Sequence, residues 1–141
     1  MTNKTIIFGL PKPNVQYTER RAAYVVIVDG KGRVATVRAL EKHFLPGGGS
    51  DPGEAPEETV IREVYEELGR SVRLTRGLGE AIQYFYSSTD AAYYRMTATF
   101  FAGEFTEQSE GTGEHELSWL PVNEIEHACF HACHAWAVLQ A

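Results

Sequence analysis

An apolar run near the N-terminus constrains the fold more than any other part of this chain. The segment 22–28 reads Ala-Ala-Tyr-Val-Val-Ile-Val, which contains no charged residue and is rich in β-branched side chains. Such a run is typical of a strand buried on both faces of its sheet. Together with the further strands and the two separate helices predicted below, it indicates a layered α/β fold.

The length and composition fit one compact domain over residues 1–141 and leave little room for a second. Hydrophobic residues make up 43% of the chain and charged residues 23%, which excludes a disordered or fibrous protein. The formal net charge is −6, so the chain lacks the broad basic surface of a nucleic-acid-binding protein. It has no apolar run long enough to span a membrane, and its two cysteines form no disulfide framework. We therefore expect a cytoplasmic protein that binds neither DNA nor membranes.

Strand signals recur on both sides of one breaker-rich loop at 45–53. Residues 33–40 are expected to return from the first apolar run as a hairpin, because Asp-Gly-Lys-Gly at 29–32 is a turn signal. Further strands are predicted by their apolar and β-branched residues at 6–8, 72–88, 93–105 and 117–120. The polar, Gly-containing stretch 106–113 is expected to be a loop.

From Val122 onward the sequence predicts one amphipathic helix. Apolar or small residues recur there in steps of four and three, namely Ile125, Cys129, Ala132, Trp136 and Leu139. On such a helix His127, His131 and His134 would share another face. Cys and His at this density can indicate zinc, but a structural zinc site usually takes its ligands from two separate elements. An ordinary amphipathic helix is the expected outcome.

A second helix is expected from about Ala55 to Leu68, because Pro56 suits a first turn and Gly69 suits a C-cap. Within it, Glu63, Glu66 and Glu67 occupy positions i, i+3 and i+4 and therefore share one face. Like charges one turn apart destabilise a helix, and a hard divalent cation would offset that effect. The alternative interpretation of the three carboxylates is a solvated acidic face.

The residues from Gly48 to Arg70 resemble the Nudix box, G-x5-E-x7-R-E-U-x-E-E-x-G-U, where U is a bulky aliphatic residue. All seven fixed positions match, namely Gly48, Glu54, Arg62, Glu63, Glu66, Glu67 and Gly69. At ordinary residue frequencies such a match arises by chance about once in 10⁸ windows. Val64 matches the first U, whereas Arg70 departs from the last one. The chain is thus similar to the Nudix hydrolase family.

This resemblance implies a Nudix-type α/β/α sandwich around a mixed β-sheet. It also implies a pyrophosphohydrolase that uses Mg²⁺ or Mn²⁺ to cleave a phosphoanhydride bond in a nucleoside diphosphate derivative. In the family pattern Glu66 and Glu67 would be the first metal ligands, and Glu63 would be a further ligand or would orient the attacking water. The carbonyl of Gly47 would also face the metal. Arg62 would pair with Glu54 and fix the geometry of the loop and the helix.

The general base varies within the family. Glu63 is favoured here, and Glu114 is the main distal candidate for both the base and a further metal ligand. Glu114 precedes Trp119 by five residues, as an additional metal-binding glutamate does in some relatives. Glu110 and Glu116 are rivals in the same segment. Each of these three can equally be an ordinary loop charge.

Two sequence markers bear on the substrate. Tyr86 lies 17 residues after Gly69, which resembles Nudix enzymes that act on diadenosine polyphosphates. No proline occurs between Gly69 and Leu120, unlike the pattern of the ADP-ribose subgroup. A dinucleoside polyphosphate or a nucleoside triphosphate is therefore favoured over ADP-ribose. Arg20 is either a phosphate contact or an ordinary charge at the edge of a strand.

Two other functions remain open for a chain with this pattern. One is a non-catalytic Nudix-like sensor that only binds a nucleotide, although such a protein has no need of Arg62 and all three glutamates. The other is different chemistry on the same fold, such as mRNA decapping or isoprenoid isomerisation. Family members are often dimers, so a homodimer is possible here.

Overall fold

The computed structural model describes residues 5–109 and 113–141. In chain order its elements are β1 (Ile6–Phe8), β2 (Thr18–Val26), β3 (Arg33–Ala39), β4 (Lys42–Phe44), β5 (Gly47–Gly49), α1 (Pro56–Leu68), β6 (Arg70–Ser87), β7 (Ala92–Ser109), β8 (Glu116–Pro121), a 3-10 turn (Val122–Glu124), α2 (Ile125–Ala128) and α3 (Ala132–Gln140). None of the helices in these two ranges has the length and hydropathy needed to cross a membrane.

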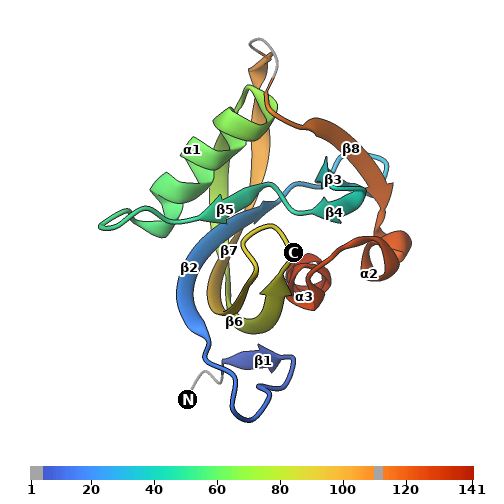
Figure 1. Ribbon diagram of the computed structural model, residues 1–141. Coiled ribbons are helices and arrows are strands. Elements are labelled where there is room, and N and C mark those ends of the chain that lie inside the picture. The colour runs from blue at the N-terminus through green and yellow to red at the C-terminus, as the bar shows by residue number, and fades with distance from the viewer. Residues whose placement is uncertain (1–4, 110–112) are drawn as a thin grey trace, which may run out of the picture.

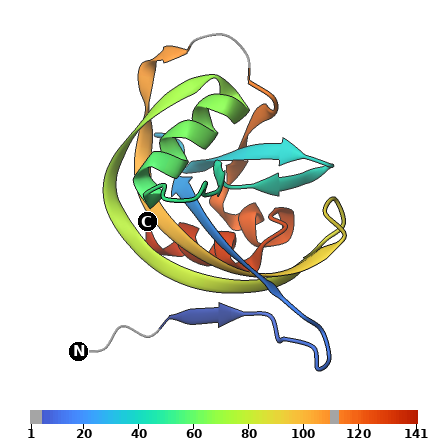
Figure 2. The same cartoon turned by 60° about the vertical axis from the view of Figure 1, so that its left-hand side comes forward.

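The strands form two sheets. The larger has the order β1-β6-β7-β2-β5, and the smaller has the order β4-β3-β8. In the larger sheet β2 runs parallel to β7 and β1 runs parallel to β6, while the other pairs are antiparallel, so this sheet is mixed as expected. The long strands β6 and β7 curve around the molecule (Figure 2). The smaller sheet lies between α1 and the C-terminal helices (Figure 1).

Strand β2 is buried on both faces, as its apolar sequence predicts. On one face Ala22, Tyr24 and Val26 belong to a core with residues of α2 and α3. On the other face Ala23 and Val25 pack in a second core with α1. Successive residues of a strand point to opposite faces, so one continuous apolar segment supplies both cores. The result is the α/β/α layering that the sequence predicts.

The prediction of a hairpin between 20–29 and 33–40 is correct only at the turn. Asp29 and Gly32 close that turn, and Ala35 donates its backbone N–H to the carbonyl of Ile27 at 2.9 Å. Beyond this contact the two strands separate, because β2 pairs with β5 and β7 while β3 pairs with β4 and β8. Neighbouring strands in the sequence therefore belong to different sheets.

Two of the predicted loops are partly strand. The segment Gly47–Gly49 pairs with β2, and a Cβ on Gly47 would lie 2.1 Å from the carbonyl oxygen of Ala23. The missing side chain therefore permits the pairing. Strand β7 continues to Ser109, which pairs with Arg70, so the loop predicted at 106–113 begins later than expected.

The single C-terminal helix is also a wrong prediction, because the chain breaks between α2 and α3. Cys129 is extended and bridges to His43, and Phe130 donates its backbone N–H to the carbonyl of His43 at 3.0 Å. The break changes the helical phase. The buried residues of α3 are Cys133, His134, Ala137 and Val138, whereas the predicted apolar position Leu139 is exposed.

Candidate functional site

Helix α1 forms where the sequence predicts it. The backbone N–H of Ala55 donates to the Glu58 carboxylate at 2.9 Å, which caps the first turn. At the other end Gly69 adopts φ 65° and donates to the carbonyl of Tyr65, a left-handed ending that glycine permits without strain. Val60 and Val64 are fully buried against the sheets. The face that carries Glu63 and Glu67 is thereby directed to the adjoining cavity.

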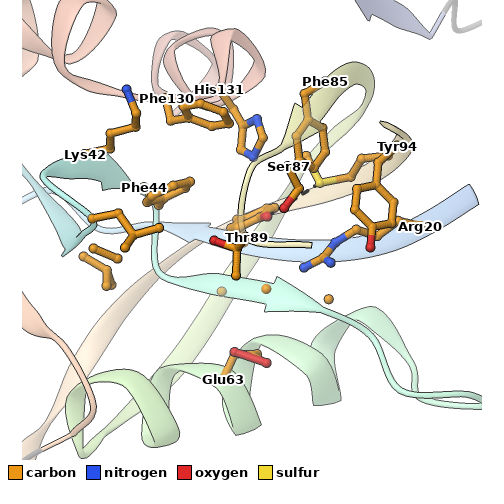
Figure 3. A pocket seen from close by; sticks show the side chains of 18 of the residues that line it. Arg20, Lys42, Phe44, Glu63, Phe85, Ser87, Thr89, Tyr94, Phe130 and His131 are labelled. Carbon is orange, nitrogen blue, oxygen red and sulfur yellow. Dashed lines mark hydrogen bonds between the residues drawn. The ribbon is translucent and has the colours of Figure 1, made fainter. Parts of the chain in front are cut away.

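A cavity of about 590 Å³ opens between α1, strands β4 and β5, and the turn that joins β6 to β7. Its size is within the range of small-molecule sites. Figure 3 shows Glu63 at one side of this cavity and Phe130, His131 and Phe85 at the opposite side, with Arg20 and Tyr94 along its length. Its walls also include Gly47, Gly48, Glu67, Phe44, Lys42 and His115.

Glu67 lies in the cavity wall next to the glycine strand. Its Oε1 accepts a hydrogen bond from the backbone N–H of Gly47 at 3.1 Å. Burial raises the pKa of Glu67 to about 8, and the nearby carboxylates of Glu63, Glu114 and Glu66 act in the same direction. An ionised Glu67 therefore needs more positive charge than the chain itself supplies.

Glu63 sits one helical turn earlier and faces the same cavity. Burial raises its pKa as well, although Arg62 opposes that effect. A Cβ on Gly48 would come within 2.8 Å of the Glu63 carboxyl, so this carboxyl occupies the space that the glycine leaves open. Two carboxyl groups with raised pKa thus line one wall.

Arg62 connects the glycine-rich loop to the carboxylates. It makes the forked contact with Glu54 that the sequence analysis expects, from Nε to Oε2 at 2.7 Å and from Nη2 to Oε1 at 2.9 Å. The hydrogen bond from Arg62 lowers the pKa of Glu54 to about 2. Nη2 also donates to the carbonyl of Gly49, and Nη1 contacts both Glu63 and Glu66 at 3.0 Å. One guanidinium group therefore sets the positions of loop and helix together.

The structure places the distal candidates for the general base or a further metal ligand in different surroundings. The backbone N–H of Glu114 donates to the carbonyl of Glu66 at 3.0 Å, and that of His115 donates to the carbonyl of Glu67 at 2.9 Å. This segment is thereby held at the C-terminal end of α1. Glu116 lies instead within β8, opposite Arg38. Glu110 falls outside the described residues.

The donor set fits a hard divalent cation. Glu63 and Glu67 supply carboxylate oxygens at the cavity, with Glu66 on the same helix and Glu114 close to its end. Within residues 5–109 and 113–141 no three carboxylate, histidine or cysteine side chains already converge on one point. The carboxylates contact Arg62 and Gly47 instead. Carboxylate oxygens with raised pKa are suitable ligands for Mg²⁺ or Mn²⁺, which would favour their ionised forms.

The tyrosine that serves as a substrate marker in the sequence is not part of the cavity wall. Phe85 faces the cavity, whereas Tyr86 does not line it and packs against Tyr93 at 4.8 Å between ring centroids. The side chain used as a marker for diadenosine polyphosphates therefore lies outside this cavity. Arg20 does line it, with its guanidinium carbon 5.5 Å from the ring centroid of Tyr94.

Sequence reasoning missed His115, Phe44, Phe130 and His131 as cavity residues. For His131, the expected continuous helix implied only a face shared with His127 and His134. The break before α3 turns Phe130 and His131 toward the cavity, and the sequence carries no helix-breaking Gly or Pro to indicate it.

A family model described as the NUDIX domain matches residues 18–137, which includes every residue of the site discussed above. The chain belongs to the NUDIX family. The solved structures agree with this assignment at the level of the fold. A NUDIX hydrolase from Nitrosomonas europaea superposes with a TM-score of 0.65 at 19% identity, over 87% of this chain and 88% of that one. The dihydroneopterin triphosphate pyrophosphohydrolase of E. coli gives 0.68 at 18% identity, over 85% and 92%.

Curated Nudix relatives match over shorter segments. The RNA pyrophosphohydrolase of Bartonella quintana is 38% identical over 79 residues, which cover 48% of this chain and 44% of that protein. Diphosphoinositol polyphosphate phosphohydrolase 3-alpha of Mus musculus is 44% identical over 46 residues, which cover 33% and 28%. The matches thus span less than half of the length of these relatives.

Proposed function

We propose that this Nudix domain is a pyrophosphohydrolase that depends on Mg²⁺ or Mn²⁺ and cleaves a phosphoanhydride bond in a nucleoside diphosphate derivative. The observation that carries the proposal is the pair of carboxyl groups, Glu63 and Glu67, which face one cavity while Arg62 joins their helix to the glycine-rich loop. When bound, a divalent cation neutralises phosphate charge and lowers the pKa of a bound water.

The chain's own residues divide the remaining tasks. Glu67, Glu66 and Glu63 would hold the cation, and the backbone N–H of Gly47 orients Glu67. Glu63 is half-buried and faces the same cavity, so it is also the candidate group for orienting the attacking water and accepting its proton. Glu114 is the candidate for a further ligand, because a backbone hydrogen bond to Glu66 holds it near the end of α1.

Arg20 is the candidate phosphate contact. Its guanidinium lies in the cavity wall, and a Cβ on Gly49 would come within 3.0 Å of Nη2. Its Nε is buried and has no hydrogen-bond partner in the described part of the chain. A phosphate oxygen would provide that partner, because guanidinium groups bind phosphate through two parallel hydrogen bonds.

A nucleoside triphosphate is the favoured substrate class. The cavity combines carboxylates and one arginine with an aromatic wall, which suits a charged phosphate chain joined to a planar base. The similarity to an RNA pyrophosphohydrolase and to a diphosphoinositol polyphosphate phosphohydrolase supports cleavage of a phosphate chain.

The test compares Glu67→Gln with Glu57→Gln on the same helix. Glu57 is exposed in the first turn and lies away from the cavity. Glu67→Gln should remove most Mg²⁺-dependent hydrolysis of a nucleoside triphosphate panel, and Glu57→Gln should retain the wild-type rate. Equal turnover in both variants would refute the role of Glu67.

A further inference from the structure

His131 is a buried polar residue that the proposed chemistry does not use. Its side chain is 4% exposed, yet it contributes to the cavity wall at the start of α3. Nδ1 is sealed from solvent and has no hydrogen-bond partner, and Nε2 makes no side-chain hydrogen bond with any described residue. An unsatisfied buried polar group costs about 1–3 kcal/mol, and a ligand group that hydrogen-bonds the imidazole from the cavity would offset that cost.

Three phenylalanine rings surround this imidazole. Ring centroids of Phe85, Phe130 and Phe44 lie 4.5, 4.8 and 5.7 Å from that of His131. All three rings also line the cavity. Figure 3 shows His131 pointing from its helix into this space beside Phe130. The wall therefore presents aromatic surface with a single polar group inside it.

This end of the cavity lies across from the carboxylates. Glu63 extends from α1 on the other side, and Arg20 lies between the two ends (Figure 3). Phosphate groups belong near Glu63 and Arg20, so the part of a nucleotide that reaches the phenylalanine wall is its base. Aromatic side chains stack on bases, and a two-ring purine offers a larger stacking surface than a pyrimidine.

We propose that His131 is a specificity-determining residue that hydrogen-bonds the purine base of the substrate, which stacks on the wall formed by Phe44, Phe85 and Phe130. This inference rests on the proposed function, because it assumes that a nucleotide occupies the cavity. Burial, with Arg20 nearby, lowers the pKa of His131 to about 4, so the imidazole is neutral at pH 7. A neutral imidazole carries one donor and one acceptor, either of which matches a group on a purine edge.

The experiment measures equilibrium binding, so it does not depend on turnover. The probes are guanosine and cytidine triphosphate analogues in which methylene groups replace both bridging oxygens, and the same triphosphate chain without a nucleoside. All are titrated in Mg²⁺ by calorimetry. His131→Phe should weaken binding of the guanosine analogue about ten-fold, which corresponds to one lost hydrogen bond to a buried group. The affinity of His131→Phe for the nucleoside-free triphosphate chain should stay at the wild-type value.

His127→Phe is the control for the substitution, because His127 is exposed on α2 and does not line the cavity. It should leave the affinities for the guanosine analogue and the nucleoside-free chain at their wild-type values. Phe130→Leu is a second variant that should fold, since Phe130 is 40% exposed. This variant should also bind the guanosine analogue more weakly while its affinity for the nucleoside-free chain stays the same.

Unchanged guanosine binding in His131→Phe and Phe130→Leu would overturn the inference, and so would an equal loss for the nucleoside-free chain. Failure of the wild-type protein to bind the guanosine analogue more tightly than the cytidine analogue would overturn it as well. The proposed function fails by a different result. In that case the wild-type protein binds the analogues but does not hydrolyse the parent nucleotides in Mg²⁺ or Mn²⁺.

Discussion

Replacing Glu67 with glutamine should make the metal-free protein more stable at neutral pH. Burial raises the pKa of Glu67 from its ordinary value near 4.5 to about 8. Between these values the folded state retains a proton that the unfolded state has released, so the free energy of unfolding falls as the pH rises. The full effect is roughly 5 kcal/mol above pH 8, of which roughly 3 kcal/mol is reached at pH 7. Glutamine has no ionisation and therefore avoids this cost.

The assay is urea denaturation in a chelator at pH values from 4.5 to 8, for the wild-type protein, Glu67→Gln and Glu57→Gln. The stability advantage of Glu67→Gln should be absent near pH 4.5 and should grow toward pH 8. Glu57→Gln should show no such trend, because Glu57 is exposed. Saturating Mg²⁺ should stabilise the wild-type protein most at the higher pH. An advantage of Glu67→Gln that is the same at every pH would refute this account of the buried carboxyl.

Three further substitutions test the surrounding structure. Arg62→Lys loses the forked contact with Glu54. We therefore expect turnover to fall about 10- to 100-fold and half-maximal activity to require a higher Mg²⁺ concentration. Unchanged kinetics would exclude the positioning role of Arg62. Gly48→Ala places a Cβ 2.8 Å from the carboxyl of Glu63, which must then move. Turnover should fall by more than ten-fold in steady-state assays, while the thermal unfolding temperature changes little. Full activity would show that catalysis does not depend on this position of the Glu63 carboxyl. Glu41→Gly relieves the backbone strain of a residue with φ 61° in the β3–β4 turn. It should stabilise the fold by about 1 kcal/mol, which raises the unfolding temperature in calorimetry by roughly 3 °C. A lower unfolding temperature would contradict that reasoning.

The features that the sequence predicts well are those set by local chemistry. Helix α1 begins at Pro56 and ends before Gly69 because capping preferences act within one or two turns. The double-sided burial of β2 follows from an uninterrupted apolar run. The contact of Arg62 with Glu54 is present at the spacing that the family pattern implies.

The features that it misses depend on contacts between distant segments. Strands β2 and β3 separate because each finds a longer partner elsewhere, which a turn signal at 29–32 does not reveal. The C-terminal helix breaks because Cys129 lies opposite His43 of β4 in a bridge and Phe130 donates its backbone N–H to the His43 carbonyl, about ninety residues earlier in the chain. That break turns His131 and Phe130 into the cavity. Helical periodicity describes only the neighbours along one helix, so it could not place them there.

The most direct test of the central claim is hydrolysis by the purified wild-type protein of a panel of nucleoside triphosphates, dinucleoside polyphosphates and ADP-ribose. Each reaction is run in chelator, in Mg²⁺ and in Mn²⁺, and the nucleotide products are separated by ion-exchange chromatography so that cleavage at any anhydride is detected. We predict turnover of the triphosphates that requires one of the two cations. Equal turnover in chelator, or no turnover of any panel member by folded protein in either cation, would contradict the proposed metal-dependent pyrophosphohydrolase.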